Sequence, residues 1–329
     1  MAGSLLNPFL ISSLPLYNFT SFTFTSAGLT GRLGPTRAQL LASYNTTSNP
    51  WLNNTSYYNV DTTFTGYQLW TVPVSGLYQF QVRGASSGSA ATKGAAALIT
   101  ATISLSQNSK IWIICGQQEN TNVETGCGGS WVVLSNNGAI AGSTPLIVAG
   151  GAGDYSYYAA ETSYQTGQSF ADAQTTNGLD ASVLNAGALN PANPITGNGG
   201  TVGGTTGNGS GGGGFNTDGE SIPAANLGEG QSFFNGLRGG LYQSVVYDTT
   251  TVAGGGFGGG GARNAGYGTG GGGGYTGGAF TGNATPGLRR STGGSSYVTP
   301  SATNVTRALA SASAPNAVAV TGQVIVTKL

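Results

Sequence analysis

Residues 254–278 read Gly-Gly-Gly-Phe-Gly-Gly-Gly-Gly-Ala-Arg-Asn-Ala-Gly-Tyr-Gly-Thr-Gly-Gly-Gly-Gly-Gly-Tyr-Thr-Gly-Gly, and this stretch decides the fold. A second glycine-rich stretch runs from Gly197 to Gly214. Tracts of glycine and serine usually act as flexible linkers. These tracts differ, because they are not padded with serine and they carry spaced aromatic residues such as Phe257 and Tyr275. A strand-like segment, 322–326, then returns the chain to a sheet, so we expect the tracts to be ordered.

Polyglycine can form an extended helix with three residues per turn and a rise of about 3.1 Å, without hydrogen bonds inside the helix. A single such helix gains nothing over a solvated coil. Several helices packed side by side satisfy one another's N–H and C=O groups, and only residues without a Cβ atom let the backbones come this close. The sequence therefore predicts a bundle of polyglycine II helices. Its expected members are Gly199, Gly200, Gly203, Gly204, Gly212, Gly255, Gly256, Gly258, Gly259, Gly271, Gly272 and Gly273.

The residues before this region show the two-residue period of β-strands. Tyr78, Phe80 and Val82 alternate with polar residues, which places three apolar side chains on one face of a strand. The preceding turn, from Pro73 to Gly76, is typical of a hairpin. Further strands are expected within 99–105, 111–115, 131–134, 146–149 and 322–326, and those at 111–115 and 131–134 are apolar on both faces, as in a sandwich core. The best helical window, 36–44, has room for one or two turns.

These patterns predict an all-β fold: an antiparallel β-sandwich of the jelly-roll type with an inserted bundle of polyglycine II helices. Residues 1–23 are expected to form an extended, apolar N-terminal arm, and residues 24–329 a glycine-rich β-sandwich domain. Within this domain, 24–149 and 315–329 are expected to be mainly sandwich strands. The stretch 150–314 is expected to be mainly polyglycine helices and loops.

The chain is poor in charge. It has eleven basic residues, eleven acidic residues and no histidine, and charged residues make up 7%, against about 25% in typical proteins. No basic run offers the electrostatic footprint that a nucleic acid requires. Without histidine, the usual general base and the commonest metal ligand are missing, so no enzyme activity, cofactor or metal is expected. A near-neutral surface is poorly protected against self-association, which favours an oligomeric assembly.

Targeting signals are also missing from the sequence. The N-terminus lacks the basic region of a signal peptide, and Pro8 and Pro15 interrupt its apolar stretch. No run of about 18 apolar residues occurs, so no membrane span is expected. Secretion by the ordinary route is therefore not expected.

Cysteines and carboxylates are the remaining candidates for chemistry. Cys115 and Cys127 are the only cysteines. They either form a disulfide or remain two reduced thiols, and metal binding needs more ligands. A glycosidase needs two carboxylates that face each other across a cleft. The nearest carboxylate pairs are Asp154 with Glu161 and Asp218 with Glu220, and polar loops are the default interpretation of both.

Two groups of aromatic residues lie among asparagines or in a tyrosine-rich loop. Exposed rings beside amide side chains suit the recognition of glycans or proteins, and the alternative is that they cover the sandwich or the glycine helices. The candidate recognition residues are Trp51, Tyr57, Tyr58, Tyr155, Tyr157, Tyr158 and Tyr164. Glycosylation acceptor patterns occur at Asn18, Asn45, Asn54, Asn208, Asn283 and Asn304, and a chain rich in Asn and Thr produces such triplets by chance.

A series of motifs covers roughly residues 22–327. In order, they are Phe24-Thr-Ser-Ala-Gly28-Leu-Thr-Gly31-Arg-Leu-Gly34-Pro35-Thr36, Gly66-Tyr67-Gln68-Leu69-Trp70-Thr71-Val72-Pro73-Val74-Ser75-Gly76-Leu77-Tyr78, Arg83-Gly84-Ala85, Cys115-Gly116-Gln117-Gln118, Gly128-Gly129-Ser130-Trp131-Val132, Leu146-Ile147-Val148-Ala149-Gly150-Gly151-Ala152-Gly153, 255–261, 270–278 and 293–297. This order resembles the glycine-rich domain in the ectodomains of the anaplastic lymphoma kinase and leukocyte tyrosine kinase receptors, which also occurs in bacterial and viral proteins.

The resemblance implies a tumour-necrosis-factor-like β-sandwich that carries a bundle of polyglycine helices, and it implies no enzyme. The kinase, signal-peptide and transmembrane segments of those receptors are absent here, so receptor signalling does not carry over. No motif matches the family's cytokine-binding residues, so these are not transferred either.

The function expected from these observations is that of a non-enzymatic virion structural protein, either capsid-associated or at the tip of a host-binding appendage. Its expected partners are other structural subunits, contacted through the N-terminal arm, and a host receptor or glycan. The expected location is the virion surface or capsid shell, with an extracellular location as the alternative. One alternative function is an exported cell-surface or matrix binding module, such as an adhesin. A second is a carboxylate-dependent hydrolase.

Overall fold

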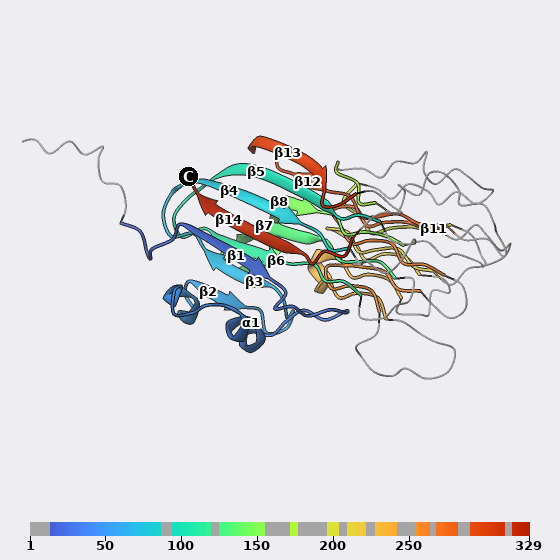
Figure 1. The fold of residues 1–329 in the computed structure, drawn as a ribbon, viewed down its shortest axis with the longest axis horizontal. Helices are drawn as coiled ribbons and strands as arrows, with labels where there is room; N and C mark the ends of the chain where they lie inside the picture. Colours follow the sequence, from blue (N-terminus) through green and yellow to red (C-terminus); the bar gives the residue numbers. More distant parts are fainter. Residues whose placement is uncertain are drawn as a thin grey trace, which may run out of the picture.

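Within its described residues, the protein has two large antiparallel sheets and a glycine-rich region, as a computed structural model shows (Figure 1). The sheets lie at one end of the molecule and the glycine-rich segments extend from the other end. The structure describes residues 14–86, 94–119, 125–154, 172–176, 196–203, 209–221, 228–241, 254–263, 268–281, 290–312 and 318–329.

The first sheet has five strands in the order β1-β14-β4-β5-β13, and all its pairs are antiparallel. Its strands are β1 (Ser21–Thr25), β4 (Gly76–Arg83), β5 (Ala97–Leu105), β13 (Thr303–Leu309) and β14 (Gln323–Lys328). In β4, Tyr78, Phe80 and Val82 are fully buried while Gln79 and Gln81 are exposed. The predicted alternation in this strand is confirmed.

The second sheet has six strands in the order β12-β8-β7-β6-β3-β2. They are β2 (Tyr58–Val60), β3 (Gln68–Thr71), β6 (Lys110–Ile114), β7 (Ser130–Asn136), β8 (Ala139–Ala149) and β12 (Tyr297–Val298). Its central strands are buried on both faces, as predicted. Ile111 and Ile113 point into the core between the sheets, whereas Trp112 and Ile114 pack in a second cluster on the opposite face.

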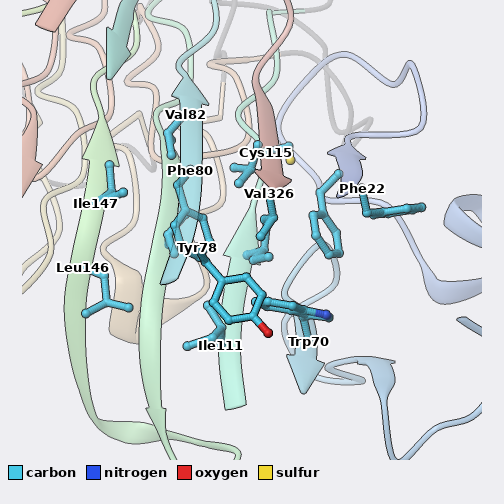
Figure 2. Close-up of a cluster of buried hydrophobic side chains, with 14 of the residues drawn as sticks. Phe22, Trp70, Tyr78, Phe80, Val82, Ile111, Cys115, Leu146, Ile147 and Val326 are labelled. Carbon is cyan, nitrogen blue, oxygen red and sulfur yellow. The ribbon is translucent and has the colours of Figure 1, made fainter. Parts of the chain in front are cut away.

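The main hydrophobic core lies between the two sheets. Figure 2 shows Tyr78 and Phe80 of β4 gathered with Ile111 of β6, Ile147 of β8 and Val326 of β14. All of these side chains are buried. Because burial of apolar surface is the main favourable term in folding, this shared core holds the two sheets together as a sandwich.

The turn from Pro73 to Gly76 was predicted to form a hairpin, and this prediction is wrong. β3 before the turn pairs with β2 and β6, whereas β4 after it pairs with β5 and β14. The chain therefore crosses from one sheet to the other here. The backbone of the N-terminal segment braces the crossover, because Leu16 N–H donates to the Pro73 carbonyl at 2.9 Å.

Residues 1–13 of the expected N-terminal arm lie outside the described residues. Residues 14–20 lie against the protein's own body: the ring of Tyr17 stacks on Trp51 at 5.2 Å, and its hydroxyl donates to the carbonyl of Thr71. Residues 21–23 belong to β1. At the other end of the chain, the sandwich strands β12 and β13 lie inside the stretch 150–314, which was expected to be mainly polyglycine helices and loops.

The remaining described elements are short. They are α1 (Arg37–Ser43), the 3-10 helices η2 (Pro50–Asn53) and η6 (Phe233–Asn235), and a small sheet of β9 (Val202–Gly203), β10 (Phe280–Thr281) and β11 (Arg290–Ser291). The helix lies in the window predicted for it. Thr36 caps its N-terminus, because the Thr36 side chain accepts from Gln39 N–H and the Gln39 side chain accepts from Thr36 N–H.

Replacing the helix cap is expected to have a small, local effect. Thr36→Ala removes the acceptor for an unpaired N–H group of the first turn and should lower the free energy of unfolding by about 1 kcal/mol in urea titration. Thr36→Ser keeps the hydroxyl and serves as the control, with a stability close to that of the parent. Equal losses in both variants would contradict this role of the cap.

Candidate functional site: the glycine lattice

The glycine-rich segments are joined by backbone hydrogen bonds, and we call this array the glycine lattice. Its described segments are 126–129, 150–153, 197–200, 209–214, 217–221, 228–233, 239–240, 254–261, 270–274, 277–279 and 291–295. They come from distant parts of the chain. Most of them pair with several others. A strand in a sheet differs, because its two edges face only two neighbours.

Segment 270–274 shows how the hydrogen bonds repeat. Its N–H groups donate to three different neighbours, and residues three positions apart donate to the same one. The bonds are Gly271 to Ser210 (2.9 Å), Gly272 to Thr292 (3.0 Å), Gly273 to Cys127 (3.0 Å) and Gly274 to Gly213 (3.3 Å). Gly271 and Gly274, three positions apart, therefore both donate to segment 209–214.

The carbonyl groups of the same segment face three further neighbours. The Gly271 carbonyl accepts from Gly261 N–H, the Gly272 carbonyl from Gly278 N–H, and the Gly273 carbonyl from Gly151 N–H. Each of these bonds is 2.8 Å long. Three neighbours through donors and three through acceptors surround the segment. The N–H and C=O groups of Gly271, Gly272 and Gly273 are thus satisfied without water, as buried backbone requires.

Segment 209–214 repeats the pattern. The N–H groups of Gly211 and Gly214 both donate to segment 217–221, to the carbonyls of Glu220 (2.8 Å) and Thr217 (3.1 Å). Their carbonyls both accept from segment 228–233, from the N–H groups of Gly230 (3.1 Å) and Phe233 (3.1 Å). The N–H groups between them donate elsewhere, from Gly212 to Gly278 (2.8 Å) and from Gly213 to Gly259 (2.7 Å). The three-residue repeat is therefore a property of more than one segment.

The lattice has no room for side chains at its contacts. A Cβ atom on Gly272 would lie 2.1 Å from the carbonyl oxygen of Gly151, and one on Gly212 would lie 2.1 Å from that of Gly272. Backbone atoms also lie within 3.0 Å of a Cβ position at Gly199, Gly200, Gly255, Gly256, Gly258, Gly271 and Gly273. Gly259 has a φ of +88°, Gly203 lies in β9, and Gly204 lies outside the described residues.

Serine and threonine hydroxyls complete the lattice where a backbone partner is replaced. Ser295 Oγ accepts from Thr276 N–H at 2.9 Å, and Ser296 Oγ accepts from Gly150 N–H at 3.1 Å. Thr292 Oγ1 accepts in the same way from Ala279 N–H at 2.9 Å. Short polar side chains thus provide hydrogen-bond partners that a longer apolar residue would remove.

Aromatic side chains couple the lattice to the sandwich. Phe215 follows segment 209–214 and Phe233 ends segment 228–233. Both pack on Trp131 of β7, with ring centroids 6.4 Å and 6.2 Å from the tryptophan. The hydroxyl of Tyr67 donates to the carbonyl of Phe233 at 2.6 Å. Together with Phe257 they bury the outer face of the six-stranded sheet. This cover explains why β6 and β7 are apolar on both faces.

No family model and no curated protein matches this chain.

The aromatic residues proposed for recognition have other surroundings. Trp51 and Tyr58 are buried in the sandwich core, and Tyr57, which is half-buried, packs beside Tyr17 at 4.8 Å. Trp51 and Tyr58 therefore lie inside the sandwich instead of forming an exposed recognition surface, and Tyr57 packs against its core. Tyr155, Tyr157, Tyr158 and Tyr164 lie outside the described residues.

The half-buried rings of Tyr275 and Tyr297 form a pair that the sequence analysis missed, because the two residues are far apart in sequence. Their centroids are 4.4 Å apart, at the rim of the second hydrophobic cluster.

The carboxylates that the structure describes support the backbone. Asp218 accepts from Ser232 N–H at 2.7 Å and from the Asn235 side chain, and Glu220 accepts from Val202 N–H at 3.0 Å. Asp154 is buried, and Glu161 lies outside the described residues. Among the described residues, no group of three or more acidic or cysteine side chains is placed to hold a metal ion.

Other sequence features remain at the surface. Asn18, Asn45, Asn54 and Asn304 of the glycosylation acceptor patterns are exposed, whereas Asn208 and Asn283 lie outside the described residues.

Within the described residues, no helix has the length and apolar character needed to cross a membrane.

The two cysteines are free thiols, and both are buried. Cys115 follows β6 and lies in the sandwich core. Cys127 lies in a lattice segment, where its thiol donates to the Glu119 carboxylate at 3.0 Å. Burial raises the pKa of Cys115, so its thiolate, the reactive form, is disfavoured in the folded protein.

The native protein is therefore expected to resist thiol reagents. At pH 8, a chromogenic disulfide reagent should modify neither cysteine of the folded protein within minutes, and both after unfolding in guanidinium chloride. The denatured sample serves as the control for thiol content. Rapid modification of the folded protein at either site would contradict the packing around it.

Proposed function

We propose that this protein is a non-enzymatic structural protein of a virus particle, either capsid-associated or at the tip of a host-binding appendage. In this proposal the sandwich has a tumour-necrosis-factor-like jelly-roll topology and the glycine lattice is a bundle of polyglycine II helices. The observation that carries the proposal is the three-residue hydrogen-bond repeat of segments 270–274 and 209–214.

The repeat favours polyglycine helices over strands for a geometric reason. A helix with three residues per turn points successive N–H groups about 120° apart, so residues i and i+3 face the same neighbour. Side chains and hydrogen bonds of a strand alternate with a period of two, so residues i and i+2 share a neighbour. Gly271 and Gly274 donate to the same segment, and so do Gly211 and Gly214. The six surrounding segments also fit a bundle of parallel or antiparallel rods.

The jelly-roll proposal is supported by how the chain changes sheets. It passes from β1 to the hairpin of β2 and β3, returns with β4 and β5, and continues through β6, β7 and β8 in the second sheet. After the lattice, β12 lies in the second sheet and β13 and β14 lie in the first. Repeated crossing between two sheets is typical of jelly rolls. The resemblance to the glycine-rich receptor domain is in keeping with this arrangement.

A structural role is supported by the use of the polar groups. The described carboxylates of Asp218 and Glu220 hold the backbone, and the chain carries eleven charges of each sign. A lattice whose segments are joined to several neighbours by backbone hydrogen bonds resists bending, which suits a rigid part of an assembly. We assign contacts with other subunits to the apolar N-terminal arm and contacts with a host receptor or glycan to the loops.

The composition of purified virus particles tests this proposal. Mass spectrometry of gradient-purified particles is expected to find the chain in a fixed stoichiometry to the major capsid protein. A soluble cellular protein from the same lysate serves as the control for carry-over. Absence of the chain from the particles would rule out the virion role. A glycan array and a cell-binding assay on the isolated protein would then test the exported binding module.

A further inference from the structure

Three exposed leucines lie at the end of the sandwich that is remote from the glycine lattice, where the N-terminal segment enters (Figure 1). They are Leu14, Leu77 and Leu329, with 87%, 50% and 61% of their surface exposed, and we call them the end patch. Leu329 N–H donates to the Leu77 carbonyl at 2.9 Å and so continues the antiparallel pairing of β14 with β4. Residues opposite each other in such a pair carry their side chains on the same face.

Gln107, which follows β5, fastens Leu14 to the same end of the sandwich. Its side-chain amide donates to the Leu14 carbonyl at 2.7 Å and to the Pro73 carbonyl at 3.0 Å. Its N–H group donates to Ser75 Oγ at 2.9 Å, two residues before Leu77. The backbone of Leu14 is therefore fixed beside the start of β4, whereas its side chain is left in solvent.

The sheet face beside the end patch is uncharged, and so is the chain that leads into it. The next row of this outer face is formed by Gln79 and Thr327, and Lys328 is paired with the inward-facing Tyr78. Residues 1–13 carry no charged side chain, and their leucine, phenylalanine and isoleucine residues are Leu5, Leu6, Phe9, Leu10 and Ile11. Such a segment can lie on this face without removing a charge from water.

We propose that the end patch binds residues 5–11 of a second copy of this chain, so that the N-terminal arm of one copy docks on the sandwich of the next. The choice of a second copy rests on the proposed structural role, in which the arm contacts neighbouring subunits. Residues 1–13 lead directly into the patch at Leu14, and in extended form they span about 40 Å, enough to reach a neighbour. Burial of apolar side chains from both copies drives the contact.

The backbone at Leu14 favours a neighbouring copy over the chain's own patch. Leu14 precedes Pro15, and a residue before proline is disfavoured in the compact backbone conformation that a tight reversal needs. The arm therefore leaves Leu14 in extended form. A copy that places its arm on one neighbour still offers its own patch to another, so the contact is head-to-tail and builds rings or open chains.

Sedimentation velocity of the full-length protein over a range of concentrations tests the contact. The parent should form dimers and larger species as its concentration rises. The arm variant, Phe9→Ser with Ile11→Ser, and the patch variant, Leu77→Gln with Leu329→Gln, should each associate at least about tenfold more weakly. Leu33→Gln is the matched control and should associate like the parent, because Leu33 is an exposed leucine beside the lattice, where its carbonyl accepts from the Gln117 side chain.

Mixing the two defective variants tests the direction of the contact. The arm variant keeps an intact patch and the patch variant keeps an intact arm, so an equal mixture should form a heterodimer and nothing larger. The parent Tm should be kept within about 2 °C in both variants, because the substituted leucines are largely exposed. If the patch variant failed this check, Leu14→Gln would replace it, since Leu14 lies outside the sheets.

Three results would overturn the contact: a parent that stays monomeric, a folded patch variant that associates like the parent, or a mixture without heterodimer. A monomeric parent that is nevertheless present in virus particles would reject this contact and leave the proposed function standing. Absence of the chain from the particles, in contrast, would reject the proposed function without changing the association of the purified protein.

Discussion

Gly272→Val is expected to prevent stable folding. The new Cβ atom would lie 2.1 Å from the Gly151 carbonyl oxygen, and that oxygen belongs to backbone that is itself bonded on both sides within the lattice. Backbone cannot move aside as a flexible side chain can, so we expect a loss of at least about 3 kcal/mol in the free energy of unfolding. Thermal unfolding and circular dichroism of the purified variant measure it. Gly258→Val should act alike, because Gly258 has a φ of +105° and a Cβ atom on it would lie 2.4 Å from the Gly129 carbonyl oxygen.

Gly76→Val is the matched control for this substitution. Gly76 begins β4, its φ lies outside the left-handed region, and a Cβ atom placed on it meets no atom within 4 Å. Valine also favours strands, so the control should retain the parent's stability. A Gly272→Val protein as stable as Gly76→Val would show that the close approach between segments does not exist.

Phe233→Ala is expected to have the second largest effect, by loosening the lattice from the sandwich. The Phe233 side chain is fully buried, and its ring lies 5.1 Å from that of Phe215 and 5.4 Å from that of Tyr67. Truncation of a buried phenylalanine costs about 3–5 kcal/mol, through lost burial and the cavity left behind. Urea unfolding followed by tryptophan fluorescence measures the loss, and Trp131 of the same cluster serves as the reporter.

Leu77→Ala is the control for this truncation, because Leu77 is 50% exposed on the outer face of β4. Its effect should stay within about 0.5 kcal/mol. If Phe233→Ala also cost less than about 1 kcal/mol, the aromatic layer would not couple the lattice to the sheet.

Local patterns in the sequence were enough to predict several elements. β4 and β5 follow from alternation, because a strand with one buried face imposes a two-residue period on its own residues. Helix α1 follows from its short periodic window. The turn before β4 was misassigned, because a proline–glycine turn has the same local signal in a hairpin and in a crossover. Which strand pairs with β4 depends on contacts with β14, far along the chain.

The pairing within the lattice was beyond prediction for a related reason. Glycine has no side chain, so a tract reveals that close approach is required but not which segment approaches. Gly272 donates to the Thr292 carbonyl and closely approaches the Gly151 carbonyl, and nothing in the sequence marks these residues as its partners. The burial of Trp51 and Tyr58 was also open, because rings beside asparagine occur in cores and at binding surfaces alike.

Amide hydrogen exchange of segment 270–274 is the most direct test of the central claim, that glycine backbones hydrogen-bond to one another in a fixed array. Each N–H of Gly271 to Gly274 has a carbonyl partner in another segment. Measured by NMR or mass spectrometry, these amides are expected to exchange as slowly as those of β4 and β5, since both need extensive unfolding to open. Exchange at the rate of an unfolded chain, while β4 and β5 remain protected, would contradict the account.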